Sequence, residues 1–403
     1  MASLSDIVRL EDPSFYWDNP YPVLQRMRQE DPVFYYEPLD MWVMSKYEDI
    51  RHVGLTPEVF SNTGGLFFSD FRYGHATKSL FFHADAENMG FMDPPRHNDI
   101  RRIAMSAFTP KILNGMREGI RKVVLDLIGP IKAGEPVNWS HQIAEPLPLL
   151  VIAILMGLPI EAYDKLKFYS DEIIKVGLDA TPEENDEISA RLASSDEYFE
   201  KLLVMRDHAP TDDLMGTIQE ARRSGQISTE SALTMIRGVV TAGNETTRNT
   251  LNGGIIALCQ NPGQLELLAA QPDLVRGTTE EFLRYVSPVR GFGRTVLRDT
   301  EVRSRKIKAG QRVLNFFMSG NRDEDTFDNP EVFDLARPRK NPNVAMGIGQ
   351  HFCIGAAVAR LEICILLEEL IKRFSKVELV GAPDADMRQL NFYGWENVQV
   401  VFS

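Results

Sequence analysis

The residues best suited to chemistry lie in one run of ten, Met346–Gly355. Gly347 and Gly349 carry no Cβ and let the backbone turn tightly against a flat ligand. His351 is placed to donate to a negative group, and Cys353 can supply a thiolate. An apolar run with helical spacing follows at once, so Cys353 lies at a helix start, where unpaired N–H groups and the dipole favour the thiolate. We therefore expect a sulfur ligand for a single iron.

A lone cysteine is more often a buried apolar residue than a ligand, but the glycine spacing and the following helix favour ligation. A zinc site is not favoured, because it needs partner ligands at short spacing. The run resembles the cysteine loop of the cytochrome P450 family, Phe-Gly-x-Gly-x-His-x-Cys-x-Gly, and differs only at Met346, where the family has Phe. The resemblance implies haem b held by Cys353 as axial ligand, with Met346, Gly347, His351 and Gly355 also at the haem site.

Composition is that of a soluble globular enzyme, with 43% hydrophobic and 25% charged residues in a chain of 403. The polar N-terminus has no apolar segment resembling a signal peptide or a membrane anchor, which predicts a cytoplasmic protein. Its three cysteines, Cys259, Cys353 and Cys364, cannot form a disulfide framework and fit a reducing compartment. The net charge of −13 argues against nucleic acid as a partner. We see no linker or repeat, and we expect one domain spanning residues 1–403 and a monomer by default.

A second informative stretch is the long helical pattern over Ser228–Cys259, with Ser228 as the expected N-cap. At about 1.5 Å per residue such a helix crosses a whole domain. Gly243 costs about 1 kcal/mol in a helix interior, so we weigh a local widening of the helix with a water-filled notch against a plain packing glycine. The stretch Ala242–Thr247 resembles the oxygen-activation motif of the cytochrome P450 family. That resemblance implies proton delivery to dioxygen through Glu245 and Thr246, with Ala242 beside the haem.

Cationic residues for haem carboxylates are found in two further stretches. Asp93 is expected to cap a helix begun by two prolines, and His97 and Arg101 share one face of that helix because they are four apart. Alone this is a solvated face, but the resemblance implies that both residues bind a haem propionate. Arg294 matches the family position that does the same from an extended segment, whereas Arg290 is expected to be solvated.

One acid–base pair is expected to be structural. Glu281 and Arg284 are three apart on a helix and form the family's Glu-x-x-Arg pair, which is costly to break when buried. Many family members supply a third arginine from a Pro-x-Arg-Phe motif, but this chain has Glu331 and Val332 between Pro330 and Phe333. Arg337 is the alternative, and the sequence leaves its role open.

The remaining pattern predicts a mainly α fold with a smaller, mostly antiparallel β region, and the resemblance implies that the haem lies between the long helix and the helix after Cys353. Short helices are expected at Pro20–Gln29 and Tyr47–Gly54, with a hairpin of Val33–Tyr36 and Met41–Met44 between them. Longer helices are expected at Pro110–Leu127, Ser140–Met156, Ile160–Leu178 and Asp186–Arg206; residues 61–92 are expected to be irregular. The resemblance implies that the last two long helices form a mobile lid, with the break between them at Pro182 and the acidic residues after it.

The substrate is expected to be apolar, because the irregular loop is rich in aromatic residues that line pockets as readily as they fill cores. By resemblance, the residues facing the substrate are Phe67, Phe68, Phe82, Met235, Val239, Val289, Phe292 and Phe392. A steroid, terpenoid or long alkyl compound is favoured, but the position oxidised is not indicated.

The resemblance implies a monooxygenase that inserts one oxygen atom of O₂, with the thiolate favouring O–O cleavage. Electrons are expected from a ferredoxin and its NAD(P)H-dependent reductase, steered by a local basic patch. The patch candidates are Arg96, Arg102, Arg337, Arg339 and Lys340. Two alternatives are a peroxide-driven haem-thiolate enzyme, disfavoured by Glu245 and Thr246, and a haem protein that binds a ligand without catalysis.

Overall fold

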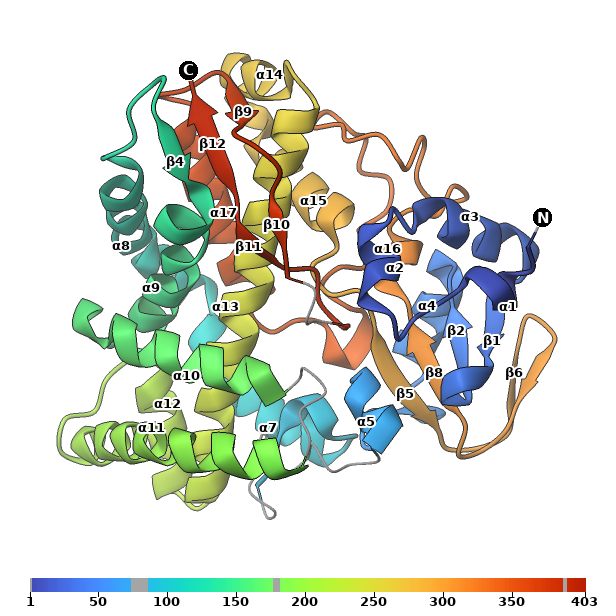
Figure 1. The fold of residues 1–403 in the computed structure, drawn as a ribbon. Helices are drawn as coiled ribbons and strands as arrows, with labels where there is room; N and C mark the ends of the chain where they lie inside the picture. Colours follow the sequence, from blue (N-terminus) through green and yellow to red (C-terminus); the bar gives the residue numbers. More distant parts are fainter. Residues whose placement is uncertain (1, 74–85, 177–181, 387–389) are drawn as a thin grey trace.

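The computed structural model describes residues 2–73, 86–176, 182–386 and 390–403. Figure 1 shows a large helical part built around α13 (Thr229–Gln260), with a smaller part rich in β-strands beside it. The predicted mainly α fold with a smaller β region is therefore confirmed. None of the described helices is long and apolar enough to cross a lipid bilayer.

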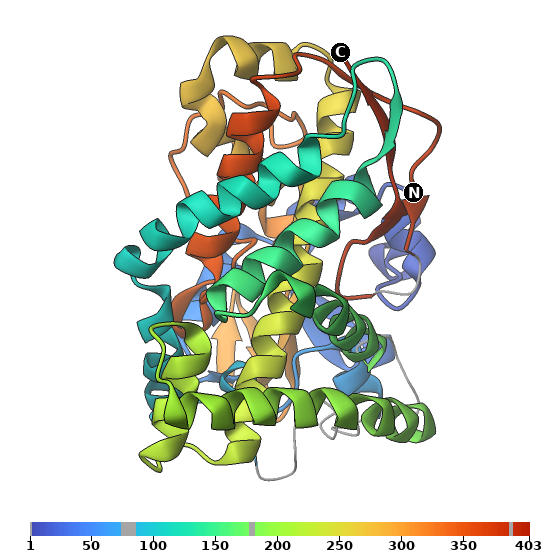
Figure 2. The same cartoon turned by 90° about the vertical axis from the view of Figure 1, so that its left-hand side faces the viewer.

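Long helices surround α13. They are α7 (Arg96–Met105), α8 (Pro110–Ile128), α9 (Pro146–Leu155), α10 (Tyr163–Val176), α11 (Pro182–His208), α12 (Leu214–Arg223), α14 (Gln264–Ala270), α15 (Val275–Val286) and α17 (Ala356–Leu370). Shorter helices are α1 (Leu4–Ile7), α2 (Pro13–Trp17), α3 (Tyr21–Glu30), α4 (Tyr47–Leu55), α5 (Phe68–Tyr73) and α16 (Phe317–Gly320). Single helical turns are η1 (Glu37–Leu39), η2 (Met89–Phe91), η3 (Ser106–Phe108), η4 (Ser140–Ala144), η5 (Ile160–Ala162), η6 (Pro272–Leu274) and η7 (Gly349–His351). In Figure 2, α10 and α11 lie across one end of α13.

The main sheet has the strand order β1-β2-β8-β5-β3. Its strands are β1 (Val33–Tyr36), β2 (Met41–Met44), β3 (Phe60–Ser61), β5 (Phe292–Val296) and β8 (Arg312–Asn315), and only the β2–β8 pair is parallel. The smaller sheets are β4-β12-β9, β10-β11 and β6-β7, made of β4 (Pro136–Asn138), β6 (Thr300–Val302), β7 (Arg305–Ile307), β9 (Val377–Leu379), β10 (Asp384–Ala385), β11 (Trp395–Asn397) and β12 (Gln399–Phe402). The predicted hairpin is confirmed residue for residue, and its turn closes through Asp40 at a φ of 45°.

The central helix α13 forms where the sequence predicts it. Ser228 caps its start, because the Ser228 side chain accepts a hydrogen bond from the N–H of Ser231 at 3.1 Å. Of the two interpretations weighed at Gly243, the structure excludes a local widening, since α13 is α-helical throughout. A Cβ on Gly243 would lie 3.0 Å from Cδ1 of Ile152, so this glycine allows α9 to pack closely on α13.

Three other predicted elements need correction. Residues 61–92 are not wholly irregular, because α5 lies within them. The predicted helix over 140–156 is divided into a π-turn, η4, and α9, which meet at Glu145 before Pro146. Helix α11 already begins at Pro182, so the acidic residues after it belong to the first turn of that helix rather than to the break.

Asp93 does not cap α7 as predicted. The helix starts at Arg96, and the Asp93 carboxylate instead accepts hydrogen bonds from the Ser61 hydroxyl and the N–H of Asn62. Asp93 thus anchors the segment before α7 to strand β3 and fixes where the face of His97 and Arg101 points.

Candidate functional site

The cysteine loop is a tight turn before α17. The N–H of Cys353 donates to the Met346 carbonyl at 2.9 Å, and the N–H of Phe352 donates to the Gly349 carbonyl at 3.0 Å. Gly347 and Gly349 have φ values of 70° and 72°, which confirms that the turn needs glycine at both positions. At Gly349 space is also required, because a Cβ there would lie 2.1 Å from the Gly54 carbonyl oxygen of α4.

Cys353 is accessible to solvent as a residue, although many protein atoms lie around it. Gly355 lies directly behind it, since a Cβ on Gly355 would be 4.0 Å from Sγ. Burial raises the pKa of Cys353 above its ordinary 9.0, against the opposing effect of the N–H groups of Gly355 and Ala356 and of two arginines. The helix start alone does not offset the effect of burial on this thiol; a metal cation bound at the sulfur would supply the remaining stabilisation of a thiolate.

A cluster of histidine and arginine side chains lies beside Cys353. The rings of His97 and His351 are 4.3 Å apart, and both Nε2 atoms are buried without a hydrogen-bond partner among the described residues. Burial together with Arg294, His97 and Arg101 lowers the pKa of His351 to about 3. Burial also lowers the pKa of Arg294 to about 10. Such a group of buried donors lacks an anion, and the two carboxylates of a haem would supply that negative charge.

Helix α13 also leaves room on the side of this site. Gly238, Ala242 and Thr246 follow each other at intervals of four and so share one helix face. Ala242 is exposed although it stands mid-helix in the core of the molecule, and a Cβ on Gly238 would meet nothing within 4 Å. The described residues therefore fit a flat group between this face of α13 and Cys353.

The predicted acid and hydroxyl lie next to that face. Glu245 is 6% exposed, and burial raises its pKa above the ordinary 4.5. Its Oε1 accepts a hydrogen bond from Asn249 Nδ2 at 2.8 Å. The Thr246 hydroxyl donates to the Ala242 carbonyl at 2.8 Å. A buried, protonatable carboxyl and a hydroxyl at the edge of an internal space form an arrangement that can hold and pass a proton.

Aromatic residues from three separate segments meet near the site. The Phe67 ring centroid lies 5.7 Å from that of Phe292 and 6.2 Å from that of Phe392, and the latter two are 6.4 Å apart. These three phenylalanines form an apolar wall. Val289 forms a β-bridge with Phe392 but is 7% exposed and packed in a hydrophobic core cluster, and Val239 on α13 packs against a different cluster.

Other predicted substrate residues do not join that wall. Phe68 is 2% exposed and Met235 is 5% exposed, and both are packed in hydrophobic core clusters. We assign them to the core, because side chains so thoroughly covered have no surface to offer a ligand. Phe82 lies outside the described residues.

Arg290 was expected to be solvated, but it is fully buried. Its guanidinium lies 3.9 Å from the Tyr16 ring centroid and 4.6 Å from that of Tyr393 and donates to the Leu390 carbonyl at 2.9 Å. This cation–π sandwich stabilises the contact between the N-terminal and C-terminal segments. No local sequence signal indicates it, because the two tyrosines lie far apart in the chain.

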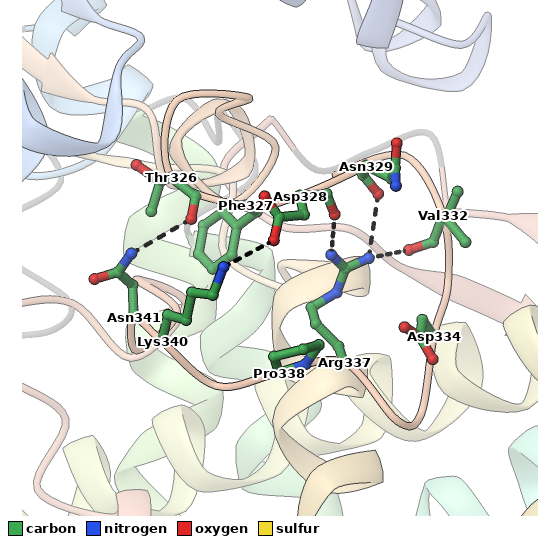
Figure 3. A pocket seen from close by; sticks show the side chains of 10 residues that line it. All are labelled: Thr326, Phe327, Asp328, Asn329, Val332, Asp334, Arg337, Pro338, Lys340 and Asn341. Atoms are coloured by element: carbon green, nitrogen blue, oxygen red, sulfur yellow. Dashed lines mark hydrogen bonds and ion pairs between the residues drawn. The ribbon is translucent and has the colours of Figure 1, made fainter.

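The Glu281–Arg284 pair is buried, as predicted, with Nη2 to Oε1 at 2.7 Å. Arg337 fills the place of the missing third arginine, since its Nε lies 3.1 Å from the Glu281 carboxylate. Figure 3 shows the Arg337 guanidinium pointing to the backbone carbonyls of Asp328, Asn329 and Val332. Arg337 therefore ties the irregular segment before the cysteine loop to α15 and does not belong to an exposed basic patch.

Comparisons with known proteins agree with this geometry. The model of the family "Cytochrome P450" matches residues 140–393. A putative cytochrome P450, YjiB, of Bacillus subtilis (strain 168) is 32% identical over 371 residues, covering 90% of this chain and 89% of that protein. A steroid C26-monooxygenase of Rhodococcus jostii (strain RHA1) is 32% identical over 405 residues, covering 96% of this chain and 82% of that protein. The crystal structure of CYP108D1 from Novosphingobium aromaticivorans is similar, with a TM-score of 0.88 and 27% sequence identity. The match covers 100% of this chain and 98% of that protein.

Proposed function

The chain belongs to the cytochrome P450 family and is a haem-binding monooxygenase, and from that premise we propose that it hydroxylates an apolar organic substrate with electrons from a ferredoxin. We further propose that the whole chain forms a single haem domain, because α13 packs against α9 and α15 as well as against β9 and β11 near the C-terminus. Its three unpaired cysteines fit a reducing compartment.

Cys353 is the proposed ligand of the haem iron, and the observation that carries this role is its accessible position beside the cluster of His97, His351, Arg101 and Arg294. When bound, haem supplies the oxidation of the substrate with O₂, and a thiolate ligand favours cleavage of the O–O bond. The chain positions this group through His97, Arg101, His351 and Arg294, which hold its carboxylates. Arg101 is oriented for this by donating to the Phe352 carbonyl at 2.6 Å.

The test of this ligand is the carbon-monoxide difference spectrum of the reduced protein. We expect the band typical of a haem with a thiolate ligand, and we expect Cys353→Ser to abolish it. Cys364→Ser is the matched control, since Cys364 is half-buried in α17 and its Sγ contacts the Thr279 hydroxyl. An unchanged spectrum in Cys353→Ser contradicts the assignment.

Glu245 and Thr246 are proposed to control the delivery of protons to the site where oxygen is activated. Burial raises the pKa of the Glu245 carboxyl, so it takes up a proton more readily than an exposed acid, and the Thr246 hydroxyl, with ordered water, passes a proton into the space beside Ala242. We expect Thr246→Ala to lower product formed per NADH roughly tenfold or more, since positioned acid–base groups supply about 10²–10⁴-fold. Thr250→Ala is the control, because Thr250 makes the same backbone hydrogen bond one turn further along α13. An equal yield of product per NADH in the Thr246→Ala and Thr250→Ala variants contradicts the role of Thr246 in proton delivery.

The apolar wall of Phe67, Phe292 and Phe392 supports an apolar substrate such as a steroid, terpenoid or long alkyl compound. Aromatic surfaces with few polar groups are typical of pockets for such molecules. A relative named for steroid oxidation shares 32% identity with this chain. The test is a panel of these compounds scored by the spectral shift of the haem on binding. Shifts produced only by charged or strongly polar compounds contradict the proposal.

A ferredoxin is the proposed electron donor. Arg102 and Lys340 are exposed at 75% and 71% of their side chains, each beside a single acid, and are available to an acidic carrier. Reversing the charge at Arg102 and at Arg339 should slow reduction and weaken its dependence on salt. Unchanged rates and an unchanged salt dependence contradict this partner.

A further inference from the structure

One buried amide, that of Asn391, joins the three segments that carry the apolar wall. Asn391 is 2% exposed. Its Oδ1 atom accepts a hydrogen bond from the N–H of Phe68 at 3.1 Å, and its Nδ2 atom donates to the Gly291 carbonyl at 3.2 Å. Phe68, Gly291 and Asn391 each adjoin one half-buried ring of the wall, and these rings are Phe67, Phe292 and Phe392.

The middle segment of the wall is fixed by the main sheet. Phe292 begins β5 and pairs with Asn315 of β8. A Cβ on Gly291 would lie 2.5 Å from the Asn315 carbonyl oxygen, so the residue before β5 also lies tightly against β8. The N–H of Gly293 donates to the Leu66 carbonyl at 2.8 Å and attaches the segment before α5 to this strand. Strand β5 is therefore the reference to which the other two segments are attached.

The C-terminal segment is attached by its backbone on one side and by the Asn391 side chain on the other. The N–H of Arg290 donates to the Asn391 carbonyl at 2.8 Å, beside the β-bridge between Val289 and Phe392. Toward α5, the Asn391 side chain accepts from Phe68, whose N–H has no acceptor within the helix because it lies in the first turn. An amide suits this place, since its planar group offers an acceptor and a donor at once.

We infer that Asn391 is a positioning residue for the substrate: its amide holds the Phe392 ring in place against the rings of Phe67 and Phe292, and so sets the shape of the apolar wall. The inference rests on the proposed function, in which this wall faces an apolar substrate. It adds a polar residue that is itself covered and that acts on the substrate only through the three rings.

Loss of the amide should loosen one contact within the wall. Asn391→Ala removes both side-chain hydrogen bonds and leaves the N–H of Phe68 and the Gly291 carbonyl buried without this partner. The backbone hydrogen bonds of Gly293 and Arg290 remain, so β5 stays in place while the C-terminal segment and the start of α5 separate. An apolar ligand should then lose contact with the wall, whereas the cluster that holds the haem carboxylates keeps its own contacts.

The experiment compares two ligands of the holoenzyme, 1-methylimidazole and 1-dodecylimidazole, which bind haem iron through the same ring nitrogen. The affinity of the dodecyl compound divided by that of the methyl compound measures how well the alkyl chain is held, because differences at the iron cancel. Both affinities come from the spectral shift of the haem. We expect this ratio to fall roughly fivefold or more in Asn391→Ala, since about 40 Å² of lost apolar contact corresponds to that factor.

Asn252→Ala is the matched control. Asn252 is also fully buried, and its amide also bridges two segments, because it accepts from the Ser140 hydroxyl at 3.0 Å and donates to the Trp395 carbonyl at 3.3 Å. Its loss removes the same two kinds of hydrogen bond away from the wall, so the ratio should stay unchanged. A ratio that falls equally in Asn391→Ala and Asn252→Ala, or in neither, overturns the inference.

Phe67→Ala separates the inference from the proposed function. This variant should lower the ratio by itself, and Asn391→Ala should then add less than it does in the unaltered protein, because both act through one wall. Additive effects overturn the inference and leave the proposed wall intact, whereas an unchanged ratio in Phe67→Ala contradicts both. If Asn391→Ala fails to fold, Asn391→Asp keeps the acceptor for Phe68 and loses the donor to Gly291. Its ratio should also fall, and an unchanged ratio overturns the inference.

Discussion

Two histidine rings with unused nitrogen atoms define the haem-carboxylate site at the scale of single residues. His97 is fully buried, its Nδ1 lies 3.2 Å from Asn98 Oδ1, and its Nε2 has no hydrogen-bond partner among the described residues. With Nδ1–H donating to that oxygen, Nε2 can donate to an anion when the ring is protonated on both nitrogens. His351 is in the same position, because its buried Nε2 also lacks a partner among the described residues. Residues held in this way are organised for a ligand before it binds, which lowers the cost of binding.

We expect His97→Phe to release haem faster. Loss of one hydrogen bond to a charged group costs about 1.5–3 kcal/mol, which corresponds to roughly ten- to a hundredfold in the release rate. The rate is measured by transfer of haem to an excess of an acceptor protein. The control is His208→Phe, because His208 is exposed at the end of α11; equal release rates in the two variants contradict the role of His97.

At the scale of elements, the glycines of α13 show how closely its neighbours approach. A Cβ on Gly254 would lie 2.1 Å from the Phe282 ring of α15, whereas one on Gly238 would meet nothing within 4 Å. We expect Gly254→Ala to destabilise the protein by about 1–3 kcal/mol through overpacking. Gly238→Ala should instead be neutral or stabilising by up to about 1 kcal/mol, because alanine is the better helix former. Chemical unfolding measures both, and equal effects contradict the packing argument.

The acid–arginine network joins α15 to the segment before the cysteine loop. Glu281 forms ion pairs with both Arg284 and Arg337, and it is 3% exposed. Glu281→Ala leaves two buried guanidinium groups without their acid, so we expect a loss of about 3–5 kcal/mol. Asp126→Ala is the control, since it removes only an exposed i, i+4 pair with Lys122, worth about 0.3–0.5 kcal/mol. A loss at Glu281 as small as that at Asp126 contradicts a structural role for the network.

How much of the fold and of the site the sequence predicts depends on how far apart along the chain the contacting residues lie. The hairpin, the start of α13 and the glycines of the cysteine loop are predicted correctly, because turns, caps and φ preferences act over a few residues. Arg290, Asp93 and Phe68 are misplaced because their environments are set by Tyr16, Ser61 and Asn391, which come from other segments. Arg337 could only be named as a candidate, since its partner Glu281 is 56 residues away.

At the scale of the whole molecule, the buried acid Glu362 should make stability depend on pH. Burial raises its pKa well above the ordinary 4.5, and only Thr247 opposes this through a hydrogen bond. The folded protein therefore keeps a proton that the unfolded chain releases above pH 4.5. The stability that this proton contributes to the folded state is fully present below pH 4.5 and is lost as the pH rises toward the pKa of Glu362 in the folded protein.

We therefore expect the difference in unfolding free energy between the unaltered protein and Glu362→Gln to shift in favour of the variant as the pH rises. The slope should approach about 1.4 kcal/mol per pH unit between pH 4.5 and the raised pKa of the folded state. Thermal unfolding across that range measures it. Glu118→Gln on the exposed face of α8 is the control, and parallel pH profiles for Glu362→Gln and the unaltered protein contradict the buried proton.

The parallel pairing of β2 with β8 also bears on how the chain is made. Met41–Met44 pairs with Arg312–Asn315, so on the ribosome the first hairpin emerges about 270 residues, or roughly 15–50 s, before the strand that completes its sheet. Throughout that interval one edge of β2 offers unpaired backbone groups and apolar side chains to any neighbouring nascent chain. Slower elongation should therefore increase aggregation during synthesis, and chaperones that bind early segments should raise the yield of the native enzyme.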